Sequence, residues 1–132
     1  MGICPQKFGP YFWGAMHLAC LYADDYETLK KFVESYVEML PCPACRIHFA
    51  EVIHYHPFPA ESHNLDYFKW SVDAHNIVNS RLGKTQWSYD EAFREWTSGC
   101  DGDYDKHEDL KIRTGLVIIL ILVAVLFFRL RK

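Results

Sequence analysis

Apolar side chains at helical spacing constrain the fold of this chain more than any other feature. Between residues 10 and 97 they recur every three or four positions, and no segment alternates apolar and polar residues as a half-buried strand would. At 132 residues the chain suits one domain around one core. The sequence therefore predicts an all-α fold, with helices over residues 10–23, 25–40, 42–53, 64–82 and 88–97.

Local signals mark where these helices begin and end. Pro10 suits the first turn of a helix, where its missing N–H has no partner to lose. Asn64 is a good cap for the fourth helix, and Gly83 is suited to end that helix. Ser88 followed by Glu91 forms a capping-box pattern, which predicts a short fifth helix.

The segment Cys42-Pro43-Ala44-Cys45 places two cysteines at the predicted start of the third helix. Pro43 fits the first helical position, so Cys42 is expected to cap the helix and Cys45 to lie in its first turn. The helix dipole stabilises a thiolate there. Two cysteines at this spacing form either a reducible disulfide or half of a metal site.

The metal alternative is a zinc-binding structural or interaction module. Cys42 and Cys45 are followed by His48, His54 and His56, and such a set matches the ligands that zinc prefers. A thioredoxin-like reductase is a weaker alternative, because it needs strands before its cysteine pair and the pattern contains none.

Polar residues on otherwise apolar helical faces favour the redox alternative. His75 and Asn79 interrupt the apolar face of the fourth helix, Trp13 and His17 lie on the first, and Lys84 follows the fourth. A helical bundle lined by these side chains beside a dithiol would suit a planar aromatic cofactor with polar edges.

Five segments together resemble one known family. They are Trp13–His17, Leu40–Cys45, Phe68–Trp70, His75–Asn79 and Leu82–Lys84. In this order and spacing they are similar to the motifs of the FAD-dependent sulfhydryl oxidases of the Erv/ALR (augmenter of liver regeneration) type. The resemblance covers residues 10–100, which we take as the oxidase domain after an N-terminal segment of residues 1–9.

The resemblance implies a four-helix bundle with a short fifth helix around FAD, and a homodimer. Cys42 would exchange with thiol-containing protein substrates, and Cys45 would face the flavin, which passes electrons to O2 and yields hydrogen peroxide. The residues implied in the flavin pocket are Trp13, His17, Tyr22, Cys45, His75, Asn76, Val78, Asn79, Lys84 and Trp96.

The chain also departs from the family pattern. Tyr89 stands where relatives carry a structural cysteine, so Cys100 lacks its usual partner, and Pro10 replaces a common arginine. Either Cys4 or Cys100 would act as a shuttle that carries electrons from substrate to the Cys42–Cys45 pair, or the two would join each other as a staple within or between subunits. Cys20 lies on an apolar stripe and is expected to be a buried free thiol.

The C-terminal region differs sharply in charge and hydropathy. All 17 acidic residues precede residue 111, whereas Lys111, Arg113, Arg129, Arg131 and Lys132 follow, so the helical domain is acidic and unsuited to nucleic acid. Residues 101–111 are predicted to form an acidic linker. Residues 112–130 would span about 28 Å as a helix, close to the thickness of a membrane core.

We therefore expect a single-pass C-terminal membrane anchor, with the catalytic domain on the cytosolic side. Such a compact anchored form resembles the enzymes encoded by large DNA viruses, where virion proteins or a thioredoxin-like carrier would be the substrates. Host membranes and the virion are the expected locations, and expression late in infection is the expected timing.

Overall fold

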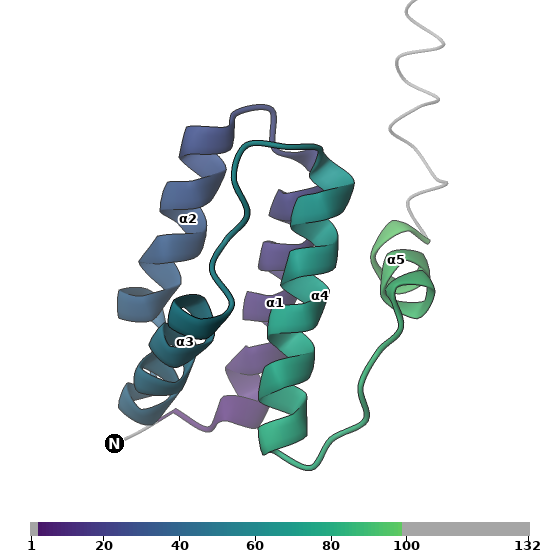
Figure 1. The fold of residues 1–132 in the computed structure, drawn as a ribbon. Helices are drawn as coiled ribbons and strands as arrows, with labels where there is room; N and C mark the ends of the chain where they lie inside the picture. The colour runs from purple at the N-terminus through teal and green to yellow at the C-terminus, as the bar shows by residue number, and fades with distance from the viewer. Residues whose placement is uncertain (1–2, 99–132) are drawn as a thin grey trace, which may run out of the picture. The chain divides into compact units, whose positions relative to one another are not determined.

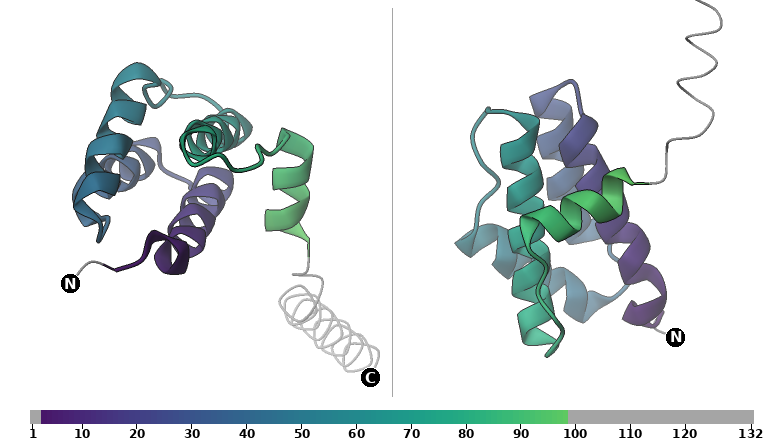
Figure 2. Two further views of the ribbon diagram at one scale, coloured as in Figure 1. Left: turned by 90° about the horizontal axis from the view of Figure 1, so that it is seen from below. Right: turned by 90° about the vertical axis from the view of Figure 1, so that its right-hand side faces the viewer.

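The computed structural model describes residues 3–98, and this part of the chain is helical with no strand. Four helices form an up-down-up-down bundle, in which α1 packs against α4 and α2, and α3 packs against α2 and α4 (Figure 1). The short α5 crosses beside α1 and α4 (Figure 2). The predicted five-helix architecture is confirmed: α1 is Pro5–Tyr22, α2 Tyr26–Met39, α3 Pro43–Tyr55, α4 Asn64–Arg81 and α5 Tyr89–Thr97.

The first helix begins earlier than the sequence predicts. Cys4 is the extended residue before α1, and Pro5 takes the first helical position in place of Pro10. Pro10 lies inside the helix, where it removes one backbone hydrogen bond to the preceding turn. Two prolines five residues apart both suit an early helical position, so the sequence signal was ambiguous, and the prediction that Pro10 opens the helix was wrong.

The remaining helix ends follow local chemistry, with one exception. Ser88 and Glu91 form the predicted capping box, in which each backbone N–H donates to the other side chain at 2.9 and 3.2 Å. Gly83 follows α4 with a φ of 62°, as expected for a helix terminator. Asn64 does not cap α4, because its amide donates to the Leu21 and Ala23 carbonyls at the end of α1.

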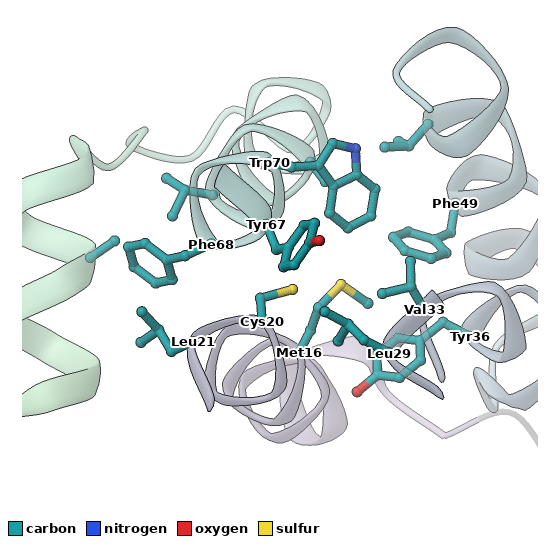
Figure 3. Packing of buried hydrophobic residues seen from close by; sticks show 14 of the residues in the cluster. Met16, Cys20, Leu21, Leu29, Val33, Tyr36, Phe49, Tyr67, Phe68 and Trp70 are labelled. Carbon is teal, nitrogen blue, oxygen red and sulfur yellow. The ribbon is translucent and has the colours of Figure 1, made fainter. Parts of the chain in front are cut away.

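The apolar core fills the space between the four long helices (Figure 3). Met16 from α1, Leu29 and Val33 from α2, Phe49 from α3 and Phe68 from α4 are each at most 3 % exposed. Cys20 is completely buried beside them, as predicted.

The buried face of α4 differs from the predicted single stripe. Leu65 and Leu82 are more than half exposed, whereas Tyr67, Trp70 and Ala74 are buried. The reason is that α4 contacts α1 on one side and α3 on the other, so its buried face is wider than one stripe.

Several predictions concern residues beyond this part of the structure. Cys100, the linker at 101–111 and the anchor at 112–130 lie outside the described residues. Between residues 3 and 98, no helix has the length and apolar character needed to cross a membrane.

Candidate active site

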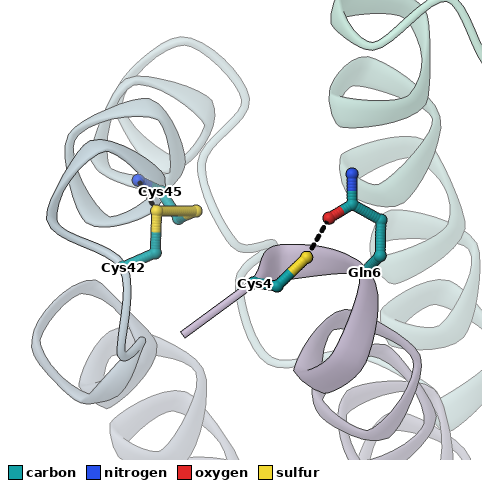
Figure 4. The surroundings of a disulfide bond; sticks show 4 residues. All are labelled: Cys4, Gln6, Cys42 and Cys45. Atoms are coloured by element: carbon teal, nitrogen blue, oxygen red, sulfur yellow. Dashed lines mark hydrogen bonds between the residues drawn. A yellow bond between two sulfur atoms is a disulfide. The ribbon is translucent and has the colours of Figure 1, made fainter. Parts of the chain in front are cut away.

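Cys42 and Cys45 form a disulfide at the start of α3, with their Cα atoms 5.1 Å apart (Figure 4). Cys42 is the extended capping residue, Pro43 is the first helical residue, and the Cys45 N–H donates to Cys42 Sγ at 3.2 Å. The sequence prediction for this segment is confirmed. A thiolate formed at Cys42 by reduction would keep this donor and the favourable end of the helix dipole.

An aromatic path leads from the disulfide into the bundle. Phe49 lies one helical turn after Cys45 on the same face of α3, and Cys45 packs against the core. The Phe49 ring meets the Trp13 ring edge-on, with centroids 6.1 Å apart. Trp13 in turn stacks on His75 at 4.2 Å, with the ring planes 11° apart. The structure thus brings α1, α3 and α4 together around residues that the sequence assigned to one pocket.

His17 and His75 form a hydrogen-bonded pair behind Trp13. Nε2 of His17 lies 3.1 Å from Nδ1 of His75, and Nδ1 of His17 lies 2.8 Å from the Ser71 hydroxyl. Burial, and then the neighbouring His75, lower the pKa of His17 to about 3. Burial, and then the charge of Lys84, lower the pKa of His75 to about 4. Both rings are therefore neutral at physiological pH.

The turn after α4 positions two further predicted residues. The Lys84 N–H donates to the Asn79 carbonyl at 2.9 Å, and the positive φ of Gly83 lets the chain reverse there. Lys84 lies close enough to His75 for its charge to affect that histidine. Val78 is partly buried on the same helix and packs against the core.

Trp96 from α5 completes the cluster of Trp13, His17 and His75, because it packs against His17 and α1. Its ring centroid lies 5.5 Å from that of His17. The ring approaches α1 so closely that a Cβ added at Gly14 would lie 2.8 Å from it. Only glycine at this position permits that approach, so Gly14 shapes the wall of the site.

The donor set fits a flavin dinucleotide. Half-buried Trp13, His75 and Trp96 rings offer flat surfaces, and Lys84 offers a positive charge for phosphates. Asn79 is only 5 % exposed and lies one helical turn after His75 on α4, and its amide can both donate to and accept from a polar ligand group.

Two further predicted pocket residues lie outside the ring cluster of Trp13, His17, His75 and Trp96, and their contact with the cofactor stays a prediction. Both amide atoms of Asn76 bond the backbone of Trp87, at 2.8 and 2.9 Å, so this side chain holds the loop before α5. Tyr22 is 65 % exposed, nine residues along α1 from Trp13.

A shallow groove of about 470 Å³ lies on a different face of α4 from His75. It is lined by Asp73, Asn76, Ile77, Ser80, Arg81 and Gln86.

Sequence reasoning missed three residues of the site. Ser71 contacts His17, Phe49 links the disulfide to Trp13, and Gly14 admits Trp96. A serine inside the apolar run of α4 was a visible signal, because a fully buried hydroxyl requires a partner. The other two depend on which helices become neighbours, and no local pattern specifies that.

The zinc alternative gains no support. Cys42 and Cys45 bond each other. In the described part of the chain, no three His, Cys, Asp or Glu side chains gather where they could hold a metal ion. The histidines at 54 and 56 are near the other end of α3 from the cysteines.

A helical bundle with a disulfide at a helix start, beside stacked tryptophan and histidine rings, defines a thiol–disulfide redox protein of the flavin-binding class. Residues 10–97 match the model of the Erv1 / Alr family. The chain belongs to this family.

Relatives of known name agree with this assignment. A protein of Acanthamoeba polyphaga mimivirus, named a probable FAD-linked sulfhydryl oxidase, is 33 % identical over 96 residues, which is 67 % of each chain. A FAD-linked sulfhydryl oxidase of African swine fever virus is 32 % identical over 91 residues, covering 64 % of this chain and 75 % of the relative. A cysteine-to-serine mutant of Erv1 from Saccharomyces cerevisiae has the same fold, with a TM-score of 0.65, 20 % identity, and coverage of 76 % of this chain and 90 % of that one.

Proposed function

We propose that this protein is a FAD-linked thiol oxidase that forms disulfide bonds in protein substrates through Cys42 and Cys45. The observation that carries the proposal is the Cys42–Cys45 disulfide at the start of α3, one helical turn before Phe49, whose ring contacts the stacked pair of Trp13 and His75. The test is to purify the protein and add dithiothreitol. A yellow protein with flavin absorbance and oxygen uptake is expected, whereas a colourless protein with stoichiometric zinc would contradict the proposal.

The thiol–disulfide step follows from the environments of the two sulfurs. A substrate thiolate attacks Cys42 Sγ, the S–S bond breaks, and Cys45 leaves as a thiolate in the first turn of α3. The second substrate thiolate then attacks the mixed disulfide, and Cys42 leaves as a thiolate that accepts the Cys45 N–H. The substrate loses two electrons and two protons, and the dithiol of this protein holds them.

FAD, when bound, would accept these two electrons and deliver them to O2, which is reduced to hydrogen peroxide. The protein's own part is to hold the ring system beside Cys45. Trp13 and Trp96 would pack on flat surfaces of the cofactor, and Lys84 would pair with its phosphates. Asn79, which is largely buried, would bond a polar edge of the cofactor with its amide.

Cys4 is proposed as the shuttle cysteine. It is exposed and reduced, and it lies at the start of α1 on the side toward the disulfide (Figure 4). Cys20 is the other free cysteine among the described residues, and burial raises its pKa to about 12, so it is a poor nucleophile. We expect Cys4→Ser to slow oxidation of a protein substrate but not of dithiothreitol, while Cys20→Ala slows neither. If Cys4→Ser oxidises both substrates at the rates of the unsubstituted protein, Cys4 is not the shuttle. Cys100 would then be tested alone.

A homodimer is proposed through the outer face of α1. Between Lys7 and Asp24 the chain carries no formally charged side chain. The outer face presents Tyr11, Ala15, Leu18 and Tyr22, and the two tyrosines and Leu18 are between 40 % and 78 % exposed. We call this set the α1 stripe.

The spacing of the α1 stripe suits a two-fold axis. If two α1 helices crossed antiparallel midway between Ala15 and Leu18, Tyr11 would meet Tyr22 of the partner subunit, and Ala15 would meet Leu18 of the partner subunit. A two-fold interface requires this reciprocity. Leu18→Glu would place two charges at its centre and is expected to raise the dimer dissociation constant by at least about a hundredfold, measured by analytical ultracentrifugation. Leu65→Glu, on a somewhat more exposed leucine of α4, is the control, and an equal effect of both variants would contradict this interface.

The proposed location is a membrane, with residues 112–130 as a single-pass anchor and the oxidase domain in the cytosol. The unbroken apolar run at 115–128 supports this proposal. Named relatives from large DNA viruses support a host membrane or a virion as the setting. Extraction of the full chain by alkaline carbonate would contradict the anchor. Protection of the domain from protease in intact microsomes would contradict the cytosolic orientation.

The proposed substrates are dithiols of virion proteins, or of a thioredoxin-like carrier that serves them. Disulfides are otherwise rare in the reducing cytosol, so an oxidase located there would supply them. In Cys45→Ser, the Cys42 thiolate should attack the disulfide of the oxidised substrate, so that one substrate sulfur leaves as a thiolate and the other stays joined to Cys42. Without Cys45 this mixed disulfide is not resolved within the enzyme, and it should capture the substrate. Capture of the same proteins by a Cys42→Ser variant would argue against Cys42 as the substrate-facing sulfur.

A further inference from the structure

A buried chain of hydrogen bonds runs from the backbone of α4 to the edge of the ring cluster. The Ser71 hydroxyl lies 2.7 Å from the Phe68 carbonyl, His17 Nδ1 lies 2.8 Å from the same hydroxyl, and His17 Nε2 lies 3.1 Å from His75 Nδ1. Ser71 and His17 are at most 1 % exposed, so water does not substitute for any of these bonds. The resemblance assigned no role to Ser71.

Each of these three contacts must contain one proton, because two acceptors at hydrogen-bond distance repel each other. Only Ser71 can supply the proton to the Phe68 carbonyl, since a carbonyl oxygen only accepts. The Ser71 oxygen must then accept, so His17 carries its proton on Nδ1. His17 Nε2 is consequently a lone pair, and His75 must donate to it from Nδ1.

Arrangements with a charged ring are excluded at neutral pH. A doubly protonated His17 would also satisfy Ser71, but the pKa of His17 is lowered to about 3 by burial and by His75. The pKa of His75 is lowered to about 4 by burial and by Lys84. In the opposite neutral arrangement, Ser71 would donate to His17 Nδ1 and His17 Nε2 would donate to His75. No proton would then remain between Ser71 and the Phe68 carbonyl.

We propose that Ser71, acting through His17, fixes the tautomer of His75 so that its Nε2 is an unprotonated hydrogen-bond acceptor facing the cofactor site. Ser71 is thus a positioning residue. The ligand chemistry that this selects is a donor, such as a ribose hydroxyl or the amino group of adenine, and a carbonyl or phosphate oxygen would be disfavoured. The ligand part rests on the proposed flavin function, whereas the tautomer part rests on the hydrogen bonds alone.

The test is nitrogen NMR of the histidine side chains in the flavin-loaded protein labelled with ¹⁵N-histidine. In the unsubstituted protein, His17 and His75 should both carry the proton on Nδ1. In Ser71→Ala, His17 Nδ1 has no acceptor, so His17 should move its proton to Nε2 and donate to His75, which becomes protonated at Nε2. The FAD dissociation constant should rise about tenfold, because a donor then faces a donor.

A matched control is present in α2. The Ser35 hydroxyl donates to the Phe32 carbonyl at 2.6 Å, the same bond without a histidine. Ser35→Ala should leave both tautomers and the FAD affinity unchanged, and Ser71→Thr, which keeps the hydroxyl, should restore the tautomers. A proton on Nε2 of His75 in the unsubstituted protein, or unchanged tautomers in Ser71→Ala, would overturn the proposal. Protein purified without flavin would contradict the proposed function, while its spectrum would still report the tautomers.

Discussion

The disulfide end of the bundle and the core around Cys20 both contain cysteine sulfur, but in opposite environments. Cys42 and Cys45 lie at a helix start, partly exposed, with an N–H directed at sulfur. Cys20 is completely buried among Met16 and other apolar side chains, and burial raises its pKa to about 12. The difference teaches that position in the fold, rather than the presence of a thiol, decides where redox chemistry occurs.

The largest expected effect comes from removing a sulfur at the disulfide end. Cys45→Ser should lower oxygen consumption with dithiothreitol by at least about a thousandfold, because no disulfide remains to exchange. Cys20→Ala should keep the rate within about twofold, since its thiol is buried and protonated. Comparable losses in both variants would show that the two environments do not differ in function.

A substitution in the core should lower the stability of the fold and leave the redox chemistry intact. Phe68→Ala removes a ring that is 2 % exposed and should lower the free energy of unfolding by about 3–5 kcal/mol, measured by denaturant titration. Tyr55→Ala is the control, because Tyr55 is 81 % exposed and its loss should change stability by less than about 0.5 kcal/mol. A folded Phe68→Ala protein should still show disulfide exchange at Cys42. Loss of exchange in a fully folded variant would contradict the separation of core stability from redox chemistry.

Acid should act on the boundary between the two regions, where His17 and His75 lie. Their folded pKa values, about 3 and about 4, lie below the unfolded value of 6.5. The unfolded state therefore binds protons first, and stability present above pH 6.5 is lost as pH falls from about 6.5 toward about 3. The slope should approach about 1.4 kcal/mol per pH unit for each histidine. Unfolding titrations at several pH values check this, and a His75→Asn variant should have a shallower slope.

The smallest effect should come from Gly14, where α1 meets Trp96. Gly14→Ala places a methyl group 2.8 Å from the indole ring, and it should cost about 1–3 kcal/mol of stability and shift Trp96 fluorescence. Gly9→Ala is the control in the same helix, with nothing within 4 Å of the added carbon, and it should be neutral or stabilising by up to about 1 kcal/mol. Equal changes in both variants would mean that Trp96 does not pack on Gly14 in solution.

The local predictions that held depend on chemistry within one turn of helix. Cys42 caps α3, Gly83 ends α4, and Ser88 pairs with Glu91 because each partner is only a few residues away. One failure was a place where a distant segment competed for the same group: Asn64 bonds the end of α1 instead of capping α4.

By itself, the sequence determined that this chain is helical, that Cys42 and Cys45 lie at a helix start, and which family its motifs resemble. These conclusions come from periodicity and spacing, which act over short stretches of chain. Only the tertiary structure decided that Phe49 joins the disulfide to Trp13, that Gly14 admits Trp96, and that Ser71 contacts His17. Each joins side chains from different helices, and packing of whole helix faces, not local propensity, determines which of them meet.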